Sequence, residues 1–306
     1  MRANRFEYGD MLCQLAKEDP RIVIVDSDIS VGLNYGTFIK EFPDRYFNCG
    51  IAEQNMVSVA TGLATCGLIP FAASFAVFTS MRALDQLRNG GCYNNFNIKV
   101  IGTHAGIETG ADGATHQSIE DIAIMRSIPN LKVLVPSTPI MTRKLTKASA
   151  YTDGPVYLRF GREPCAELYM PEDEFPIGKS KVLVQGNDAA IFACGHMVHI
   201  AVEASKRLKT IGKNVRVVDM YSIKPIDIQA ILLAARETQG IVTIEDHSIL
   251  GGLGGAICEI VCQHYPTKVL RVGINDVFGR SGTMAELNKA FGLTSDHLVE
   301  TVLSLF

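Results

Sequence analysis

Two imidazoles and a carboxylate share one glycine-rich stretch, His104-AGIETGA-Asp112-GAT-His116. Imidazoles gain and lose a proton near neutral pH, and beside a carboxylate they can hydrogen-bond hydroxyl groups and move protons. The glycines let the backbone fold closely around a small molecule. A zinc site is the alternative, but the spacing matches no common zinc motif and the stretch has no cysteine. We therefore interpret the stretch as a functional loop.

Glu53 stands at the start of a helix-length apolar run, in the string Gly50-IAEQ-Asn55. A carboxylate there either complements the helix dipole or faces a ligand as a functional acid. Taken alone, the position favours the dipole interpretation. Phe75 and Phe78 follow a strand-like run; their periodicity indicates core packing, although a flat ligand can stack on rings placed beyond a strand.

Arg159 and Arg162 lie on either side of the end of another strand-like run, 156–160. Two guanidinium groups at such a position can clamp a phosphate or carboxylate, because each presents its donors as a fixed fork. Solvated surface arginines are the competing interpretation, and the sequence alone does not separate the two.

Short β-branched runs alternate with helix-length amphipathic segments along the chain, which is typical of parallel sheets covered on both faces. We predict two consecutive doubly wound α/β domains, at 1–165 and 187–306, joined by an acidic linker and lead-in strand at 166–186. Ligands of open parallel sheets bind beyond the carboxyl ends of the strands, where the candidate residues fall. The expected strands are 21–26, 45–49, 70–75, 99–103, 132–136, 156–160, 189–194, 215–219, 241–245 and 269–272. The expected helices are 5–17, 54–66, 79–89, 119–126, 139–150, 198–209, 227–236, 255–264, 284–291 and 295–305.

The composition narrows the class of protein further. A formal net charge of −3 over 306 residues offers no basic surface for nucleic acid. No apolar run approaches the ~18 residues of a membrane span, and the N-terminus has no signal-peptide pattern, so we expect a cytoplasmic protein without membrane contact. Eight scattered cysteines are expected to be reduced, buried small hydrophobes.

At the level of whole strings, the chain resembles the transketolase family over essentially its entire length. No single sequence motif would establish this resemblance. Together the motifs are highly specific, and they occur in the order of the family's pyrimidine-binding and C-terminal domains. The strings are Asn48-CGIAEQN-Met56, Thr103-HAGIETGADGATH-Gln117, Ile119-EDIAIMRSIP-Asn130, Gly154-PVYLRFGR-Glu163 and Ile223-KPI-Asp227.

The resemblance implies thiamine diphosphate as the cofactor. Glu53 resembles the family glutamate that hydrogen-bonds the aminopyrimidine ring and promotes its imino form, and Phe75 and Phe78 resemble the aromatics that pack on that ring. Three loop residues resemble those that bind sugar hydroxyls and assist proton transfer: His104, Asp112 and His116.

The resemblance also implies sugar phosphate substrates. Arg5 and Arg162 resemble the pair that grips the substrate phosphate, and Arg159 matches a further basic position of some members. The sequence differs from the family pattern at one position of the phosphate site, because Gly32 stands where many transketolases have a phosphate-contacting serine. Ser30 is the candidate substitute.

The chain lacks the G-D-G motif of the family's diphosphate-binding domain, whose side chains hold Mg²⁺. We therefore expect the C-terminal half of a split transketolase, transferring ketol groups only with an N-terminal partner subunit that supplies the Mg²⁺ ligands. The expected assembly is a heterotetramer, and the apolar segment Met56–Ala64 is a candidate for its two-fold contact unless it is buried in the chain's own core.

Three other functions fit parts of the pattern. A split 1-deoxyxylulose-5-phosphate synthase shares the I-A-E-Q and D-G-x-T-H-Q strings, but its loop normally begins Arg-Ala-Gly and is one residue shorter. The beta subunit of a 2-oxo acid dehydrogenase lacks the D-G-x-T-H-Q string. A regulatory or scaffolding subunit has no physical need for the polar set that Glu53, His104, Asp112 and His116 form.

Overall fold

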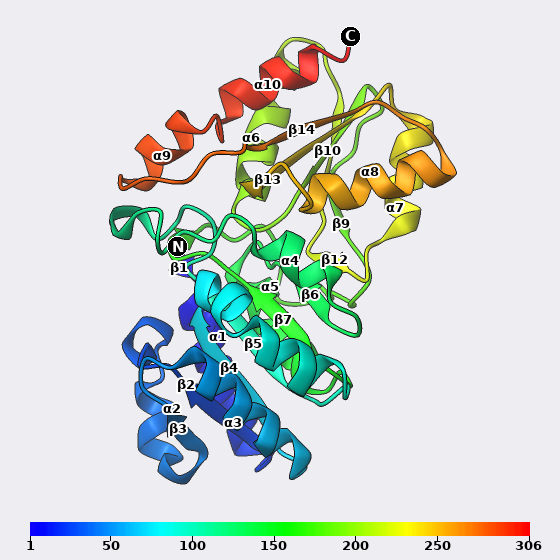
Figure 1. The fold of residues 1–306 in the computed structure, drawn as a ribbon. Helices are drawn as coiled ribbons and strands as arrows, with labels where there is room; N and C mark the ends of the chain where they lie inside the picture. Colours follow the sequence, from blue (N-terminus) through cyan, green and yellow to red (C-terminus); the bar gives the residue numbers. More distant parts are fainter.

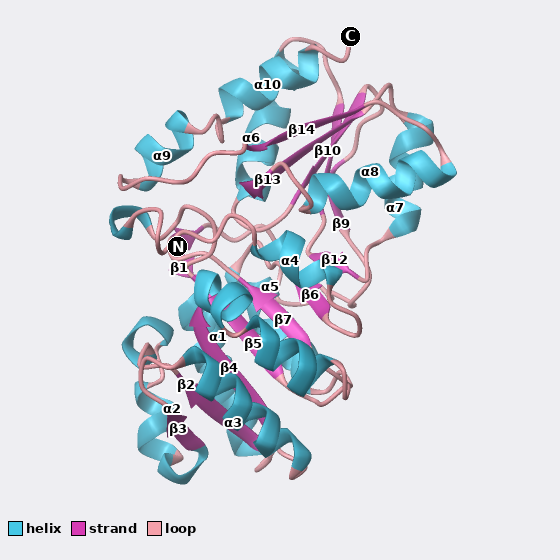
Figure 2. Ribbon diagram, in the orientation of Figure 1, coloured by secondary structure: helices cyan, strands magenta, loops and turns pink.

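The computed structural model describes all residues, 1–306, and contains two α/β units arranged one above the other (Figure 1). Each unit is a central sheet with helices on both faces, and most strands are parallel (Figure 2). The predicted fold class is confirmed. None of the helices has both the length and the apolar character that crossing a bilayer requires.

The lower unit contains a seven-stranded sheet of order β12-β6-β7-β5-β4-β2-β3. Six strands run parallel, and β12 pairs antiparallel with β6 at one edge. Its strands are β2 (Ile22–Asp26), β3 (Tyr46–Asn48), β4 (Ile69–Phe75), β5 (Lys99–Thr103), β6 (Lys132–Leu134), β7 (Val156–Arg159) and β12 (Ser222–Lys224).

Helices cover both faces of this sheet, so its strands are apolar on both sides. Along β2, Ile22 and Ile24 pack in the core under one face, whereas Val25 packs in the core under the other. Helices α1 (Asn4–Glu18) and α5 (Pro139–Ala150) lie side by side over the first face. The remaining helices of this unit are α2 (Gly36–Glu41), α3 (Glu53–Thr65) and α4 (Asp121–Ser127).

The upper unit contains a five-stranded sheet of order β14-β13-β10-β11-β9, in which only β9 is antiparallel. Its strands are β9 (Lys181–Val184), β10 (Ala189–Ala193), β11 (Val215–Asp219), β13 (Ile241–Ser248) and β14 (Val269–Ile274). Its helices are α6 (Met197–Thr210), α7 (Ile228–Glu237), α8 (Leu253–His264), α9 (Met284–Ala290) and α10 (Ser295–Leu303).

The two units are tied together more closely than the sequence indicated. Strand β12 follows β11 of the upper unit in the chain but completes the sheet of the lower one. Within the lower unit, the N-terminal β1 (Arg2–Ala3) pairs with β8 (Pro164–Cys165), just before the linker. One apolar cluster also runs from α3 through the lower sheet to Ile231 and Ile257 of the upper unit.

The helix expected at 79–89 is instead built from two π-helical segments, Phe78–Arg82 and Gln86–Cys92. The Ala83 and Tyr93 amides donate to carbonyls five residues back, at Phe78 and Arg88, over 3.1 and 2.9 Å. Hydrophobic spacing cannot distinguish this wider turn from an α-helix, and π-helical turns are frequent at functional sites.

All eight cysteines are free. Cys13, Cys92, Cys165 and Cys194 are buried, as expected. The same prediction is wrong for Cys66 and Cys262, which are exposed because each lies at or just beyond a helix end on the surface.

Candidate functional site

An open hollow of about 430 Å³ lies at the carboxyl edge of the lower sheet. Its lining follows the ends of β2, β3, β4 and β5, as expected for a ligand site of a parallel sheet. The lining residues are Ser27, Asp28, Ile29, Ile51, Glu53, Ser74, Phe75, Phe78 and His116.

Glu53 is the first residue of α3, and its carboxylate is buried, with 2% of the residue exposed. Ser74 Oγ donates to Glu53 Oε1 over 3.4 Å, and Arg82 Nη1 donates to Oε2 over 2.9 Å. The carboxylate therefore lies at the helix N-terminus and faces the hollow as well, so the two interpretations of its position are compatible.

Arg82 is a residue of the site that sequence reasoning missed. Its guanidinium lies 4.3 Å from the ring centroid of Phe78 and carries the only cationic group in salt-bridge contact with Glu53. The signal was the spacing, because Arg82 follows Phe78 by one helical turn in a helix-length segment.

The aromatic residues of the site form a compact group. The rings of Phe75 and Phe78 are nearly parallel, at 6°, with centroids 6.1 Å apart. His104 stacks on Phe75 at 4.4 Å, and His116 meets both phenylalanines edge-on at 5.9 and 5.4 Å. The structure thus brings together Glu53 and four of the other residues proposed from the sequence.

Each histidine is oriented by the threonine before it. His104 Nδ1 lies 3.1 Å from Thr103 Oγ1, and His116 Nδ1 lies 3.0 Å from Thr115 Oγ1, which leaves Nε2 of each ring for another partner. Burial, with the nearby Arg5 and Arg162 charges, lowers the pKa of His104 to about 3. His104 is therefore neutral at physiological pH.

Arg5 and Arg162 form a cationic pair beside His104. Arg5 Nε donates to the Arg162 carbonyl over 3.1 Å, Arg5 Nη1 donates to the Gly32 carbonyl over 2.5 Å, and Arg162 Nη1 donates to the Thr109 carbonyl over 3.3 Å. Neither guanidinium has a carboxylate within salt-bridge distance, although other arginines of the chain do. Burial and the Arg162 charge lower the pKa of Arg5.

Gly32 lies against this pair. A Cβ atom built on it would meet only His104 Cε1, at 3.8 Å. The position therefore has room for the serine that the resemblance implies there, so the glycine has no steric cause.

Arg159 does not join the site. Its side chain is buried between the two units, where Nε donates to Asp121 Oδ2 over 2.7 Å and Nη2 donates to the Asp246 carbonyl over 2.8 Å. This placement contradicts the expected contact with substrate phosphate, because the residue is only 5% exposed and its guanidinium is already paired with Asp121. As the last residue of β7, Arg159 is held inside the sheet, whereas Arg162 lies beyond it.

Asp112 is also outside the hollow. It ends a short 3-10 turn, Gly110–Asp112, and its side chain is exposed. Across the whole chain, no three His, Cys, Asp or Glu side chains are grouped closely enough to hold a metal ion.

Two family models match the chain. One, described as transketolase, pyrimidine binding domain, matches residues 2–166, and the other, transketolase, C-terminal domain, matches residues 178–298. Fold and site together therefore define an α/β protein that combines these two domains. The chain belongs to the transketolase family.

Individual relatives agree with this assignment. A chain of Methanocaldococcus jannaschii, named for a transketolase C-terminal section, is 45% identical over 299 residues, which cover 97% of this chain and 94% of that one. A 6-deoxy-6-sulfo-D-fructose transketolase subunit of Clostridium sp. is 38% identical over 295 residues, 96% and 92% of the two chains. A solved structure titled "Split gene transketolase, inactive beta4 tetramer" superposes with a TM-score of 0.91 at 44% identity, covering 99% and 98%.

Proposed function

We propose that this chain is one subunit of a thiamine diphosphate-dependent transketolase that transfers a two-carbon ketol unit from a ketose phosphate to an aldose phosphate. A partner subunit supplies the diphosphate-binding domain and the Mg²⁺ ligands. The names of the relatives, a C-terminal section, a subunit and a split-gene transketolase, support the division into two chains.

One observation carries the proposal: a buried carboxylate under stacked aromatic rings lies next to two arginines that have no acidic partner. The hollow itself suits a flat, basic heterocycle, since Glu53 offers a hydrogen-bond acceptor and Phe75 and Phe78 offer parallel ring faces. The other end of the site, beside His104, suits an anion, since Arg5 and Arg162 influence each other's charge and neither forms a salt bridge.

The residues present fit the pyrimidine ring of thiamine diphosphate. Glu53 would hold its ring nitrogen, and Phe75, Phe78 and Ile51 would enclose its faces. When bound, this cofactor supplies the nucleophilic carbon that takes up the ketol unit.

The chain's own groups would orient the sugar. His104 is neutral and presents Nε2, so it can hydrogen-bond a hydroxyl without adding charge beside the arginines. His116 Nε2, at the half-buried mouth of the hollow, is placed to exchange a proton with a substrate oxygen. Arg5 and Arg162 would bind the terminal phosphate and thereby fix the distance of the reacting carbon from the hollow.

We further propose a heterotetramer of two copies of each chain. The split-gene relative is described as an inactive assembly of four β chains, which supports self-association of this type of chain and inactivity without a partner. We propose that this chain likewise self-associates and is inactive without its partner.

Ketol transfer from xylulose 5-phosphate to ribose 5-phosphate, assayed with thiamine diphosphate and Mg²⁺, tests the proposal. Substantial turnover is expected only when the chain is mixed with a polypeptide that carries the G-D-G motif. Turnover by this chain alone would contradict the division of labour, and a stable complex of wild-type chains without turnover would favour a scaffolding role.

A further inference from the structure

The loop that carries both site histidines, residues 104–117, is here called the histidine loop. Its base is closed by two backbone hydrogen bonds, Gly106 N to Ser118 O over 2.8 Å and Ser118 N to Gly106 O over 3.2 Å. Beyond this bridge, the backbone hydrogen bonds inside the loop are short-range turns, such as Gly110 N to Ile107 O and His116 N to Gly113 O. The position of the histidines therefore depends on what holds the base.

The base is held by a residue of the upper unit. Asp246, near the end of β13, is 5% exposed, and both of its carboxylate oxygens accept from the Ile107 amide at 3.1 Å. A Cβ atom on Gly106 would lie 1.9 Å from Asp246 Oδ2, and Gly106 has φ +66°. The glycine is therefore required for the carboxylate to approach the loop backbone.

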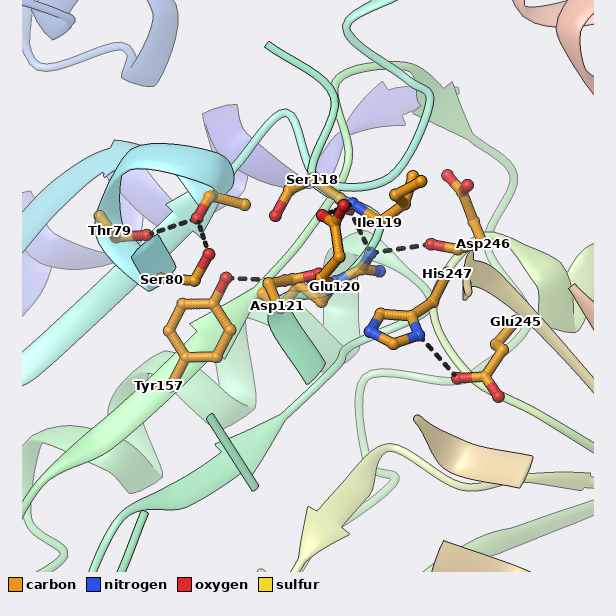
Figure 3. A network of polar contacts seen from close by, with 12 residues as sticks. Thr79, Ser80, Ser118, Ile119, Glu120, Asp121, Tyr157, Glu245, Asp246 and His247 are labelled. Carbon is orange, nitrogen blue, oxygen red and sulfur yellow. Dashed lines mark hydrogen bonds and ion pairs between the residues drawn. The ribbon is translucent and has the colours of Figure 1, made fainter. Parts of the chain in front are cut away.

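Arg159 connects this contact to the other side of the base. Its Nη2 donates to the Asp246 carbonyl over 2.8 Å and to the Ser118 carbonyl over 3.4 Å. Its Nε pairs with Asp121, which also accepts from Tyr157 (Figure 3). Both ends of the histidine loop are thus tied to one buried polar network that spans the two units.

Apolar contacts and a further hydrogen bond also attach the base of the histidine loop to the upper unit. Ile107 and Ile119, which flank the base, are buried in the core of the upper unit with Ile191 and Ile244. Directly before the bridge, Gln117 Nε2 donates to the Arg280 carbonyl over 2.9 Å. Yet every residue that lines the hollow belongs to the lower unit.

We propose that Asp246 is a positioning residue, through which the upper unit sets the place of the histidine loop and hence of His104 and His116. The upper unit then acts on the site without lining it. The consequence for turnover rests on the proposed function, whereas the consequence for the loop does not.

Amide hydrogen exchange on the full chain tests the positioning role directly. Asp246→Ala removes both acceptors, and we expect the Ile107 amide and the histidine loop to exchange about tenfold faster, while β10 and β11 keep their wild-type rates. Asp246→Asn keeps one acceptor oxygen and should limit the increase to about threefold. Asp219→Asn is the matched control: a buried carboxyl group of the same sheet whose contacts are Ser137 and Tyr169, not the loop.

If the alanine chain does not fold, the asparagine chain decides, because the same local pattern is expected in it at smaller size. Unchanged exchange at Ile107, or an increase of equal size in β10 and β11, would overturn the proposal. In the active complex, Asp246→Ala should lower kcat about tenfold and leave KM for the phosphorylated donor within about threefold. Arg5 and Arg162 come from outside the loop, and a single hydrogen bond, from Arg162 Nη1 to the Thr109 carbonyl, joins Arg162 to it. An equal loss of kcat in Asp246→Ala and Asp246→Asn would also contradict the positioning role of Asp246. If the proposed function fails, no variant has turnover to lose, and the exchange pattern still decides the positioning role.

Discussion

Arg82 donates from Nη1 to Glu53 Oε2 over 2.9 Å while its guanidinium rests on the ring of Phe78. The buried carboxylate thus has a cationic partner. An unpaired ionised carboxylate is costly to bury, and a paired, hydrogen-bonded one is tolerated. The pair also joins the start of α3 to the π-helical turn after β4, which are the two elements that shape the hollow.

Glu53→Gln should leave the fold intact and lower kcat of the reconstituted enzyme by about 10²–10⁴-fold, the scale of general acid–base contributions. The amide has the same shape but cannot share a proton with the pyrimidine. Steady-state kinetics with both subunits measures the effect, and circular dichroism checks the fold. Wild-type kcat in this variant would reduce Glu53 to a helix-end charge.

Arg82→Met should lower the free energy of unfolding by about 1 kcal/mol, because a hydrogen bond to a buried carboxylate is lost from a half-exposed partner. Arg88→Met, in the same run but bonded only to Asn89, is the control and should change stability little. In a Glu53→Gln background the cost of Arg82→Met should shrink. An equal cost in both backgrounds, measured by urea unfolding, would show that the two side chains are not coupled.

Arg162→Ala should raise KM for phosphorylated donors by roughly 10- to 100-fold and spare hydroxypyruvate, which has no phosphate. Arg5→Ala should behave in the same way, because Arg5 donates to the Arg162 carbonyl and both charges act on His104. Kinetics with both kinds of donor provides the comparison. A similar rise in KM for hydroxypyruvate would identify Arg162 as a structural residue.

The regular elements could be predicted from sequence because each is specified locally. Strands such as Lys99–Thr103 and Val215–Asp219 are short apolar runs buried on both faces, and the structure has the same bounds. Helix α5 likewise begins at Pro139, after a Thr138 side chain that caps it, and ends at Ala150, as expected.

What sequence could not supply depends on contacts between distant segments. Ser222–Lys224 reads as a connection until its pairing with β6 is seen, and the role of Arg159 depends on Asp121 and Asp246, which come from two different units. Arg159 and Arg162 look equivalent in the sequence, since both flank one strand end. Only the tertiary structure buries one and leaves the other beside the hollow.

Stability should fall as the pH rises from about 6.5 to 8. Burial raises the pKa of Asp219 to about 7, above the ordinary value of about 4, so the folded state binds this proton more tightly than the unfolded state does. The tighter binding of the proton stabilises the fold at low pH, and this stabilisation is lost as the pH rises through 7. Glu108 and Asp246, whose pKa values burial also raises to about 7, act in the same direction. Lys99, whose pKa burial lowers to about 7, acts in the opposite direction and offsets part of the fall.

The buried histidines, including His104, have lowered pKa values and therefore destabilise the fold only below about pH 6.5, outside this range. Thermal unfolding at several pH values measures the slope. Asp219→Asn should flatten it by at most about 1 kcal/mol over the range, whereas an unchanged slope would mean that Asp219 does not titrate there.

The number of copies of each subunit in the complex can also be tested. The apolar side of α3 is covered by the chain's own core, because Met56, Val57 and Ala60 are fully buried, so this helix does not require a second copy as cover. The proposed heterotetramer then rests on the self-association inferred from the split-gene relative, with the pyrimidine end of the site assigned to this chain and the Mg²⁺ ligands to the partner. Light scattering should show self-association of this chain alone without ketol transfer, and two copies of each chain in the active complex. A stable, active assembly with one copy of each chain would contradict the two-fold arrangement, even if the division of the site between two subunits held.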